Sequence, residues 1–449
     1  MSESSPTWSS ELYGILLHPS ELRVLMMWGA AGWSLPHMSL DEAVWEADVG
    51  KVSEAMRLAL GVDVTTLRYA SYSVSEDAHQ IDTIYVLESH NPAWEPQDGA
   101  EWVGRAVLAD LPLARPEHRA LVAAHLAEAE SGQIPELRPP WARVGWFELA
   151  AQWTRSELAR LGYTLTAPVE QVKSWGISCI LRARTSSGDV YFKAASSLPL
   201  FAHEPAVTRG LSWLYPDHIP TPLSIDEQHR WMLLADFGAP IEWDAPVEEQ
   251  EEILRLYGEL QRDAATRVGD LLAMGCLDRR LERLAAQVDA LLEDTETLAS
   301  QLDAAEIERL RALGPHLQAT CAELASFAVP PTLVHGDLHL GNVARSAGSY
   351  LFFDWTDACV AHPFFDTISI FEANDPNVQA RLRDSYLGVW AAYEPIERLL
   401  EAWEFAMTLC ALHQAVSYQH IVATLEDTSK PELASGLTYW LRTLLQSLA

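Results

Sequence analysis

The first 140 residues alternate between short apolar segments of strand type and longer segments in which apolar residues recur at helical spacing. This mixed pattern predicts an α+β domain. Strands are expected at 23–28, 65–74 and 81–88, and helices at 41–60 and 116–131. A linker is expected at 132–141, because the paired prolines near its end stiffen the chain and stop the preceding helix.

The remainder of the chain passes from strands to helices. After a helix at 146–161, strands are expected at 169–173, 178–185, 190–194 and 230–235. From about residue 250 the spacing is helical, apart from two apolar strands at 332–334 and 350–353. Strands followed by helices indicate a strand-rich lobe and then a helical lobe. We therefore predict three parts, 1–140, 141–239 and 240–449.

Polar residues follow both of the late strands. The first strand leads to His335 and Asp337 on a loop that Asn342 closes, and the second leads to Asp354. Phosphoryl transfer to a hydroxyl needs a carboxylate that orients the hydroxyl and accepts its proton, and separate oxygen ligands for magnesium. Asp337 suits the first task, and Asn342 and Asp354 suit the second.

At these residues the sequence resembles the aminoglycoside phosphotransferase and choline kinase-like family, over about residues 165–449. The family pattern is matched at His335, Asp337, Asn342, Asp354 and Ala358. The resemblance implies a bilobal fold related to protein kinases, ATP and Mg²⁺ as cofactors, and a small-molecule acceptor. It also implies that His335 braces the catalytic loop.

Two other interpretations use the same loop. His335 and His339 stand four apart, as zinc ligands on one face of a helix would. Gly336 and the strand-like flanks argue against a helix there. Alternatively, Asp337 and Asn342 only shape a turn, although such a turn would not require Asp354.

A candidate phosphate ligand lies in the earlier strands. Strand alternation places Lys193 on the same side as Tyr191, and a lysine fixed on a strand supplies a point charge for the phosphates of ATP. An exposed strand lysine is the alternative. Pro205 marks a helix start, with Glu204 as its N-cap or the residue before. The resemblance pairs Glu204 with Lys193, and a carboxylate set against the helix dipole is a compatible role.

Two further segments are assigned to the nucleotide. Ser174 and Ser178 could donate hydroxyls to phosphate while Gly176 permits a close backbone approach, although a single glycine also suits a plain hairpin turn. The resemblance assigns the adenine edge to an inter-lobe hinge formed by Leu234, Ala235 and Asp236. The run Asp236-Phe-Gly is not taken as the magnesium motif of protein kinases, because it precedes the catalytic loop.

The acceptor is expected to bind among polar residues after the metal ligands. Asp357 is the first candidate, and His413, Ser417 and His420 fall on one face of a helix expected at 399–425. A histidine on a helix is more often a structural residue, so that stripe also suits helix packing.

The first block resembles a Nudix-type domain at Trp33-Ser-Leu-Pro36, at the helix end Leu60-Gly61 and at Leu67-Arg-Tyr69. Nudix hydrolases depend on two adjacent glutamates just before that glycine, and here Leu58 and Ala59 occupy those places. Diphosphate hydrolysis is therefore not expected. The block would serve as a sensor, a lid or the surface of a homodimer.

Composition narrows the remaining choices. A formal net charge of −32 over 449 residues argues against nucleic-acid binding and suits a neutral or cationic small molecule, or simply a soluble acidic surface. Five widely spaced cysteines without a Cys-x-x-Cys pair argue against disulfides and zinc. The first eight residues lack the basic and apolar regions of a signal peptide, and the longest apolar-rich stretch, 24–35, is too short to span a bilayer. We expect a cytoplasmic small-molecule kinase with no membrane partner, and a non-catalytic nucleotide sensor as the alternative.

Overall fold

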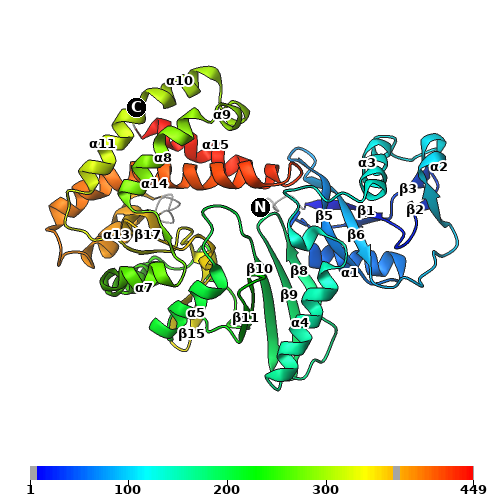
Figure 1. Cartoon of the computed structure of the whole chain (residues 1–449), viewed down its shortest axis with the longest axis horizontal. Coiled ribbons are helices and arrows are strands. Elements are labelled where there is room, and N and C mark those ends of the chain that lie inside the picture. The colour runs from blue at the N-terminus through cyan, green and yellow to red at the C-terminus, as the bar shows by residue number, and fades with distance from the viewer. Residues whose placement is uncertain (1–7, 368–374, 448–449) are drawn as a thin grey trace, which may run out of the picture. The chain divides into compact units, whose positions relative to one another are not determined.

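The computed structural model describes residues 8–367 and 375–447 of the chain (Figure 1). Two compact units divide it: the first runs to Ala194 and includes Leu425–Lys430, and the second comprises Ala195–Thr424 with the chain from Pro431 onward. The boundary at 194 differs from those predicted at 140 and 239, so the three-part division stays a prediction.

The first unit opens with two β-sheets and three helices. Its elements are β1 (Ser9–Leu16), β2 (Arg23–Gly29), β3 (Gly32–Ser34), β4 (His37–Leu40), α1 (Val49–Leu60), β5 (Val64–Ser75), β6 (Gln80–Ser89), β7 (Ala100–Gly104), α2 (Arg105–Asp110) and α3 (His118–Ser131). One sheet has the order β4-β1-β6-β5, with β1 and β6 parallel, and the other has the order β3-β2-β7. This arrangement confirms the predicted α+β character of the block.

The helix predicted at 41–60 is wrong in its first eight residues, because α1 begins at Val49. The hydroxyl of Ser10 donates to the carbonyl of Glu42 (2.8 Å) and accepts from the amide of Val44 (2.9 Å). These two bonds hold 42–44 as a loop against β1. From Val49 onward α1 buries one apolar face in the core beneath the sheet.

The strands expected after the linker also belong to the first unit. They are β8 (Glu170–Ser174), β9 (Ser178–Thr185) and β10 (Gly188–Ala195), preceded by a short 3₁₀ turn η1 (Pro140–Ala142) and by α4 (Trp146–Arg160). Gln171 on β8 is buried and exchanges two hydrogen bonds of 2.9 Å with the backbone of Thr66 on β5. This link explains why these strands fall with the first block.

The predicted linker contains a buried cation. Arg138, 6% exposed, donates to Glu128 of α3 (2.8 Å) and to Glu426 (2.6 Å) in the returning segment of the same unit. Burial raises the pKa of Glu128, but the hydrogen bonds from Arg138 and the charge of Arg68 outweigh this effect and hold that pKa below its usual range. Arg138 thus fastens residues 425–430 to α3.

The second unit begins with a helix and two short strands and continues mainly as helices. Its early elements are α5 (Glu204–Leu214), β11 (Ser224–Asp226), β12 (Trp231–Ala235), α6 (Val247–Ala264), η2 (Ala265–Arg267), α7 (Val268–Ala273), β13 (Leu277–Asp278), α8 (Leu281–Glu293), α9 (Thr295–Gln301), α10 (Ala304–Ala312) and α11 (Gly314–Leu324). Its later elements are β14 (Thr332–Val334), η3 (Leu340–Asn342), β15 (Val343–Ser346), β16 (Ser349–Phe352), η4 (Trp355–Asp357), β17 (Cys359–Ala361), η5 (Pro363–Asp366), α13 (Pro376–Gly388), α14 (Ile396–Thr424) and α15 (Lys430–Gln446).

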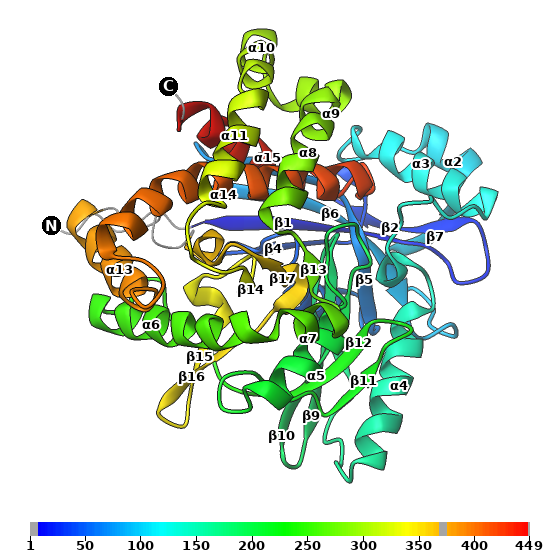
Figure 2. The ribbon, with the colours of Figure 1, turned by 60° about the vertical axis from the view of Figure 1, so that its left-hand side comes forward.

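Two apolar cores enclose the small strands of this unit. One core joins α8, α11 and α14, which pack against one another, and the other joins α5 and α6 to β14, β15, β16 and β17. Helix α6 packs along both α13 and β14 (Figure 2). The predicted order of strands before helices is confirmed. Among the described residues, the search for a helix long and apolar enough to cross a membrane finds none.

We predict that Arg138→Met lowers the free energy of unfolding by about 3 kcal/mol, because it leaves Glu128 and Glu426 without their buried partner. Methionine retains most of the apolar stem. Urea denaturation of the full chain measures the change. Arg105→Met is the matched control: Arg105 and its partner Glu130 are both more than half exposed, so the expected loss is below about 1 kcal/mol. Equal losses in the two variants would contradict a special role for Arg138.

Candidate functional site

Two small strand pairs position the polar loop. Strand β14 pairs antiparallel with β17, and the hairpin β15–β16 pairs Val343 with Phe352. Asn342, just before β15, therefore lies beside the residues that follow β16, and its carbonyl accepts the amide of Phe353 (3.1 Å). Asp354 comes next in the chain. The hairpin register brings the two predicted magnesium ligands to the same open end.

Asn342 also reaches the predicted base. Its Nδ2 donates to the carbonyl of Asp337 (2.9 Å) and to the Asp337 carboxylate (3.3 Å). Asn342 is buried, whereas the side chain of Asp337 is 56% exposed. Asn342 thus fixes the backbone and one side of the Asp337 carboxylate, and the carboxylate remains accessible to a molecule from outside.

Asp354 has a strained backbone. Its φ of 65° and ψ of 63° lie in the left-handed region, which a residue with a Cβ adopts only at a cost. The hydroxyl of Thr356 lies 2.8 Å from Asp354 Oδ1 and 3.1 Å from the buried carboxylate of Glu204. This backbone conformation turns the Asp354 carboxylate away from the direction that a continued strand would give it.

The placement of Glu204 corrects the sequence prediction by one residue. Helix α5 begins at Glu204, and His203 is its N-cap, accepting the amide of Ala206 through its ring (3.4 Å). Pro205 is therefore the second helical residue. The N-cap was missed because a histidine ring is an uncommon cap, whereas Ser, Thr, Asp and Asn lead the preferences. Pairing of Glu204 with Lys193 stays a prediction.

The donor set suits a magnesium ion shared with a phosphate. In the part of the chain that the structure describes, no three His, Cys, Asp or Glu side chains gather closely enough to hold a metal. Magnesium needs no such group when it binds through one or two side chains, substrate phosphates and water. Both hydrogens of the Asn342 amide point into the loop, and no described residue donates to its Oδ1. That oxygen and the Asp354 carboxylate are hard ligands of the right kind.

A buried carboxylate anchors the backbone of the loop that follows β14. Asp366 in η5 is 1% exposed and accepts the backbone amides of His335 (2.7 Å) and Gly336 (2.8 Å). It also accepts the hydroxyl of Tyr257 (2.5 Å) and the amide of Gln261 (3.1 Å), both on α6. Burial raises the pKa of Asp366 to about 7, against the lowering effect of these donors.

His335 has the geometry that a bracing residue requires. Its ring is fully buried, and its Nε2 lies 2.8 Å from the carbonyl of Phe353, next to Asp354. Burial lowers the pKa of His335, so the neutral ring with a proton on Nε2 is favoured. The ring therefore connects the loop after β14 to the end of β16, and it does not reach out as a metal ligand.

Gly336 is required by close packing. Its φ is +85°, and a Cβ added there would stand 2.6 Å from Cβ of Asp357 and 2.7 Å from the Asp357 carbonyl. Its own carbonyl accepts Nε2 of Gln414 on α14 (2.7 Å). Asp357, the first acceptor candidate, thus packs directly on the loop, and Gln414 donates a hydrogen bond to the same loop.

The helical acceptor candidates are more deeply placed. His413 and Ser417 on α14 are buried, and the guanidinium of Arg279 donates to the Ser417 hydroxyl (2.6 Å) and to the His413 carbonyl (2.9 Å). His420, one turn on, is partly exposed. Burial, followed by the negative charges of Asp337 and Asp357, raises the pKa of Tyr418. Acceptor contact by His413, Ser417 and His420 stays a prediction.

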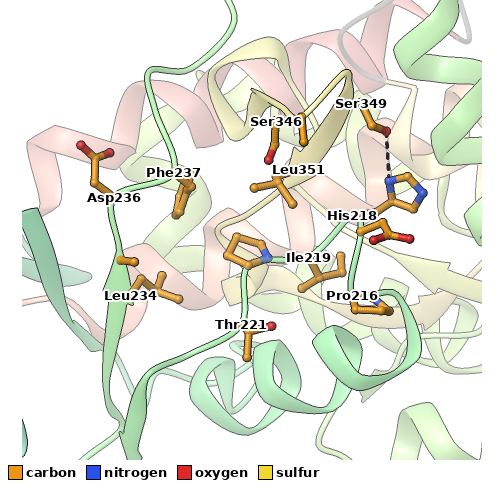
Figure 3. A pocket seen from close by; sticks show the side chains of 14 residues that line it. Pro216, His218, Ile219, Thr221, Leu234, Asp236, Phe237, Ser346, Ser349 and Leu351 are labelled. Atoms are coloured by element: carbon orange, nitrogen blue, oxygen red, sulfur yellow. Dashed lines mark hydrogen bonds between the residues drawn. The ribbon is translucent and has the colours of Figure 1, made fainter. Parts of the chain in front are cut away.

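The predicted hinge borders open space. Leu234, Ala235 and Asp236 line a pocket of about 540 Å³, whose other walls are 216–221 and the turn of the β15–β16 hairpin (Figure 3). Leu234 is partly exposed, and the next two residues are exposed, so their backbone groups are within reach of a ligand. Phe237 packs on Phe353 with ring centroids 4.9 Å apart, which connects the predicted hinge to the residue before Asp354, a predicted metal ligand.

The remaining nucleotide candidates lie in the first unit. Along β10 the buried residues alternate with Tyr191 and Lys193, so these two share one face as predicted. Ser174 and Ser178 are buried, and Ser178 accepts the indole N–H of Trp175 (2.7 Å) at the β8–β9 turn. The roles of both serines, of Gly176 and of Lys193 toward phosphates stay predictions.

Asp366 was missed because its partners are distant in sequence: Tyr257 is 109 residues away. The one local sign was an acid at the end of the apolar run Pro363-Phe-Phe-Asp366.

We predict that Asp366→Asn lowers the free energy of unfolding by about 3 kcal/mol, because an amide nitrogen would then face backbone donors. Chemical denaturation tests this value. Asp384→Asn, at an exposed aspartate paired with its neighbour Arg383, is expected to change stability by less than about 0.5 kcal/mol.

The chain is similar to known phosphotransferases. Residues 182–416, which include the loop and Asp354, match the phosphotransferase enzyme family. A glucosamine kinase of Streptacidiphilus jiangxiensis is 32% identical over 131 residues, which are 26% of this chain and 30% of that protein. The match therefore spans less than a third of the relative's length.

The chain is also similar to solved structures, including the following two. An ethanolamine kinase of Plasmodium vivax is 11% identical, with a TM-score of 0.47 and coverage of 75% of this chain and 95% of that one. A choline/ethanolamine kinase family protein from Mesorhizobium loti is 15% identical, with a TM-score of 0.44 and coverage of 66% and 98%. The family match does not reach the first block, whose Nudix-type identity stays a prediction. Because the match at 182–416 takes in more than half of the 449 residues, the chain belongs to the phosphotransferase enzyme family.

Proposed function

We propose that the protein is an ATP- and Mg²⁺-dependent phosphotransferase that acts on a hydroxyl group of a small molecule. The observation that supports this most is the hydrogen bond from Asn342 to Asp337 at the end of the hairpin that also carries Asp354. A candidate base and two candidate metal ligands are thereby held within one loop system. Phosphoryl transfer depends mainly on such positioning and on electrostatic stabilisation.

Each residue has a distinct task in this proposal. Asp337 orients the acceptor hydroxyl and accepts its proton. Asn342 and Asp354 hold magnesium, which when bound neutralises charge on the transferring phosphoryl group. Lys193 is assigned to the nucleotide phosphates, and the backbone of Leu234–Asp236 to the adenine edge.

For the acceptor we propose an aminoglycoside-like compound, an amino alcohol or a sugar-like compound. The relative named glucosamine kinase acts, by its name, on an amino sugar, which carries hydroxyls and an amine. Asp357 packs on the loop beside Asp337, so a second carboxylate is available near the base. Together with the net charge of −32, this favours an acceptor that carries an amine.

The direct test is turnover by Asp337→Ala on a panel of amino sugars, aminoglycosides and amino alcohols. We expect kcat to fall by about 100-fold to 10,000-fold, because the base is lost, with ATP binding retained. Asp384→Asn serves as the matched control and should keep full activity. Undiminished turnover by Asp337→Ala would refute the assignment of the base. ATP binding by the wild type without transfer to any acceptor would favour the sensor alternative.

The pH dependence of turnover reports on the loop anchor. As the pH falls through about 7, Asp366 gains a proton and is a weaker acceptor for the loop amides, so we expect kcat to decline on the acid side. Tyr257→Phe removes a hydrogen bond that lowers this pKa and should move the acid limb to higher pH.

Tyr386→Phe is the matched control for this experiment. Its hydroxyl is equally buried and belongs to the same network, but it donates to Gln261 (2.6 Å) and to the Pro363 carbonyl (2.9 Å) and not to Asp366. We expect the acid limb of this variant to stay in place. Identical profiles for the two tyrosine variants would show that Asp366 does not govern the limb.

A further inference from the structure

The first unit contains a pocket of its own, far along the chain from the catalytic loop. Its volume of about 350 Å³ lies within the range of roughly 300 to 1,000 Å³ that is usual for small-molecule sites. It is formed by the β1–β2 turn, by strands β5 and β6, by helix α3 and by Val144. The lining residues are 17–23, Leu67, 86–89, Leu126, Ala129 and Val144.

The walls are apolar, and two wall residues are unusually exposed. Leu17, Leu67 and Leu126 contribute hydrocarbon surface to the pocket, while Leu22 is 47% exposed and Val144 is 77% exposed. A single exposed apolar residue needs no explanation, but two that border the same pocket form a surface that a bound molecule would cover.

One carboxylate in this pocket has a hydrogen-bond donor on only one of its two oxygens. Glu88 accepts the amide of Gly145 through Oε1 (2.7 Å), while its Oε2 is buried and has no hydrogen-bond partner among the residues that the structure describes. The cation among the lining residues, Arg23, pairs with Glu21 (2.9 Å). Burial raises the pKa of Glu88, as expected for a carboxylate short of donors. A buried polar atom left in this state is costly unless something else supplies the hydrogen bond.

We propose that this pocket binds a small apolar amine, whose ammonium donates to Glu88 and whose hydrocarbon body covers Leu22 and Val144. Oε2 is covered by neighbouring atoms, but the terminal torsion of a glutamate is broad, so a modest turn presents it to the pocket. An ammonium offers three donors and an opposite charge, whereas a carboxylate ligand would be repelled by Glu88 and Glu21.

This site is separate from both functions considered above. Its lining residues belong to the first unit, whereas Asp337, Asn342 and Asp354 belong to the second. Helix α1, where a Nudix hydrolase would carry its glutamates, contributes no lining residue. The pocket therefore contains none of the residues assigned to the proposed phosphotransferase reaction or to Nudix chemistry.

Calorimetric titration of the full chain with benzylamine, benzyl alcohol and benzoate tests the proposal, because the three probes share a ring and differ in the polar group. We expect benzylamine to bind with a Kd of about 1 mM, benzyl alcohol to bind about tenfold more weakly or worse, and benzoate not to bind. The readout is binding, so it does not depend on any phosphotransferase activity.

Variants locate the binding. Glu88→Gln retains an oxygen for Gly145 and should weaken benzylamine about tenfold while leaving benzyl alcohol unchanged. Val144→Trp, at an exposed position, should fill the pocket and abolish binding of both. Asp357→Asn is the matched control, because an amine could also meet that carboxylate in the second unit, and it should leave the titration unchanged.

Three results would overturn the proposal. The first is that benzylamine does not bind the wild type at about 10 mM, which would leave water as the donor to Glu88. It could bind Glu88→Gln with the same Kd as the wild type. Loss of binding in Asp357→Asn with full binding in Glu88→Gln would instead assign the amine to the acceptor region, and would support the proposed function while refuting this site.

Discussion

The catalytic loop depends on one buried carboxylate. Asp366 accepts the consecutive backbone amides of His335 and Gly336, two donors that the turn directs away from any strand partner. Two side chains of α6, Tyr257 and Gln261, donate to the same group, so each of its oxygens has at least one donor within the chain. A carboxylate is suited to this task because it can accept four hydrogen bonds and donate none. Through it, the position of the loop is set by the core that α6 shares with the small strands.

Strain elsewhere in the site is tolerable because this anchor and the hairpin fix the backbone on either side. Asp354 lies in the left-handed region, between a strand whose register is set by β15 and a 3₁₀ turn that begins at the next residue. Such a conformation persists only where the surroundings determine it. The ring of His335 adds a third constraint by bonding to the carbonyl of Phe353, immediately before Asp354. The candidate base and the candidate metal ligands thus belong to one rigid arrangement.

Sequence reasoning succeeded where the information is local. Period-two alternation identified the face of β10 that carries Lys193, and two short apolar runs identified the strands that flank the loop. It failed where a distant residue decides the local structure. Ser10 holds 42–44 out of helix α1, and Gln171 ties β8 to β5 across 105 residues. No spacing rule connects Asp366 with Tyr257, because their contact is created only when α6 packs over β14.

The carboxylates of Asp366 and Glu88 can be compared on the same physical terms. Asp366 and Glu88 both lose hydration on folding, and burial raises the pKa of each. The fold supplies Asp366 with four hydrogen-bond donors. Its carboxylate is therefore a structural group and needs no donor from an outside molecule. For Glu88 the fold returns one backbone amide, on one oxygen only. The missing hydrogen bond to Glu88 Oε2 destabilises the fold unless a donor from outside the chain supplies it. A carboxylate that its own fold satisfies is therefore an anchor, and one that its fold satisfies by half, at the wall of a pocket, is a recognition element.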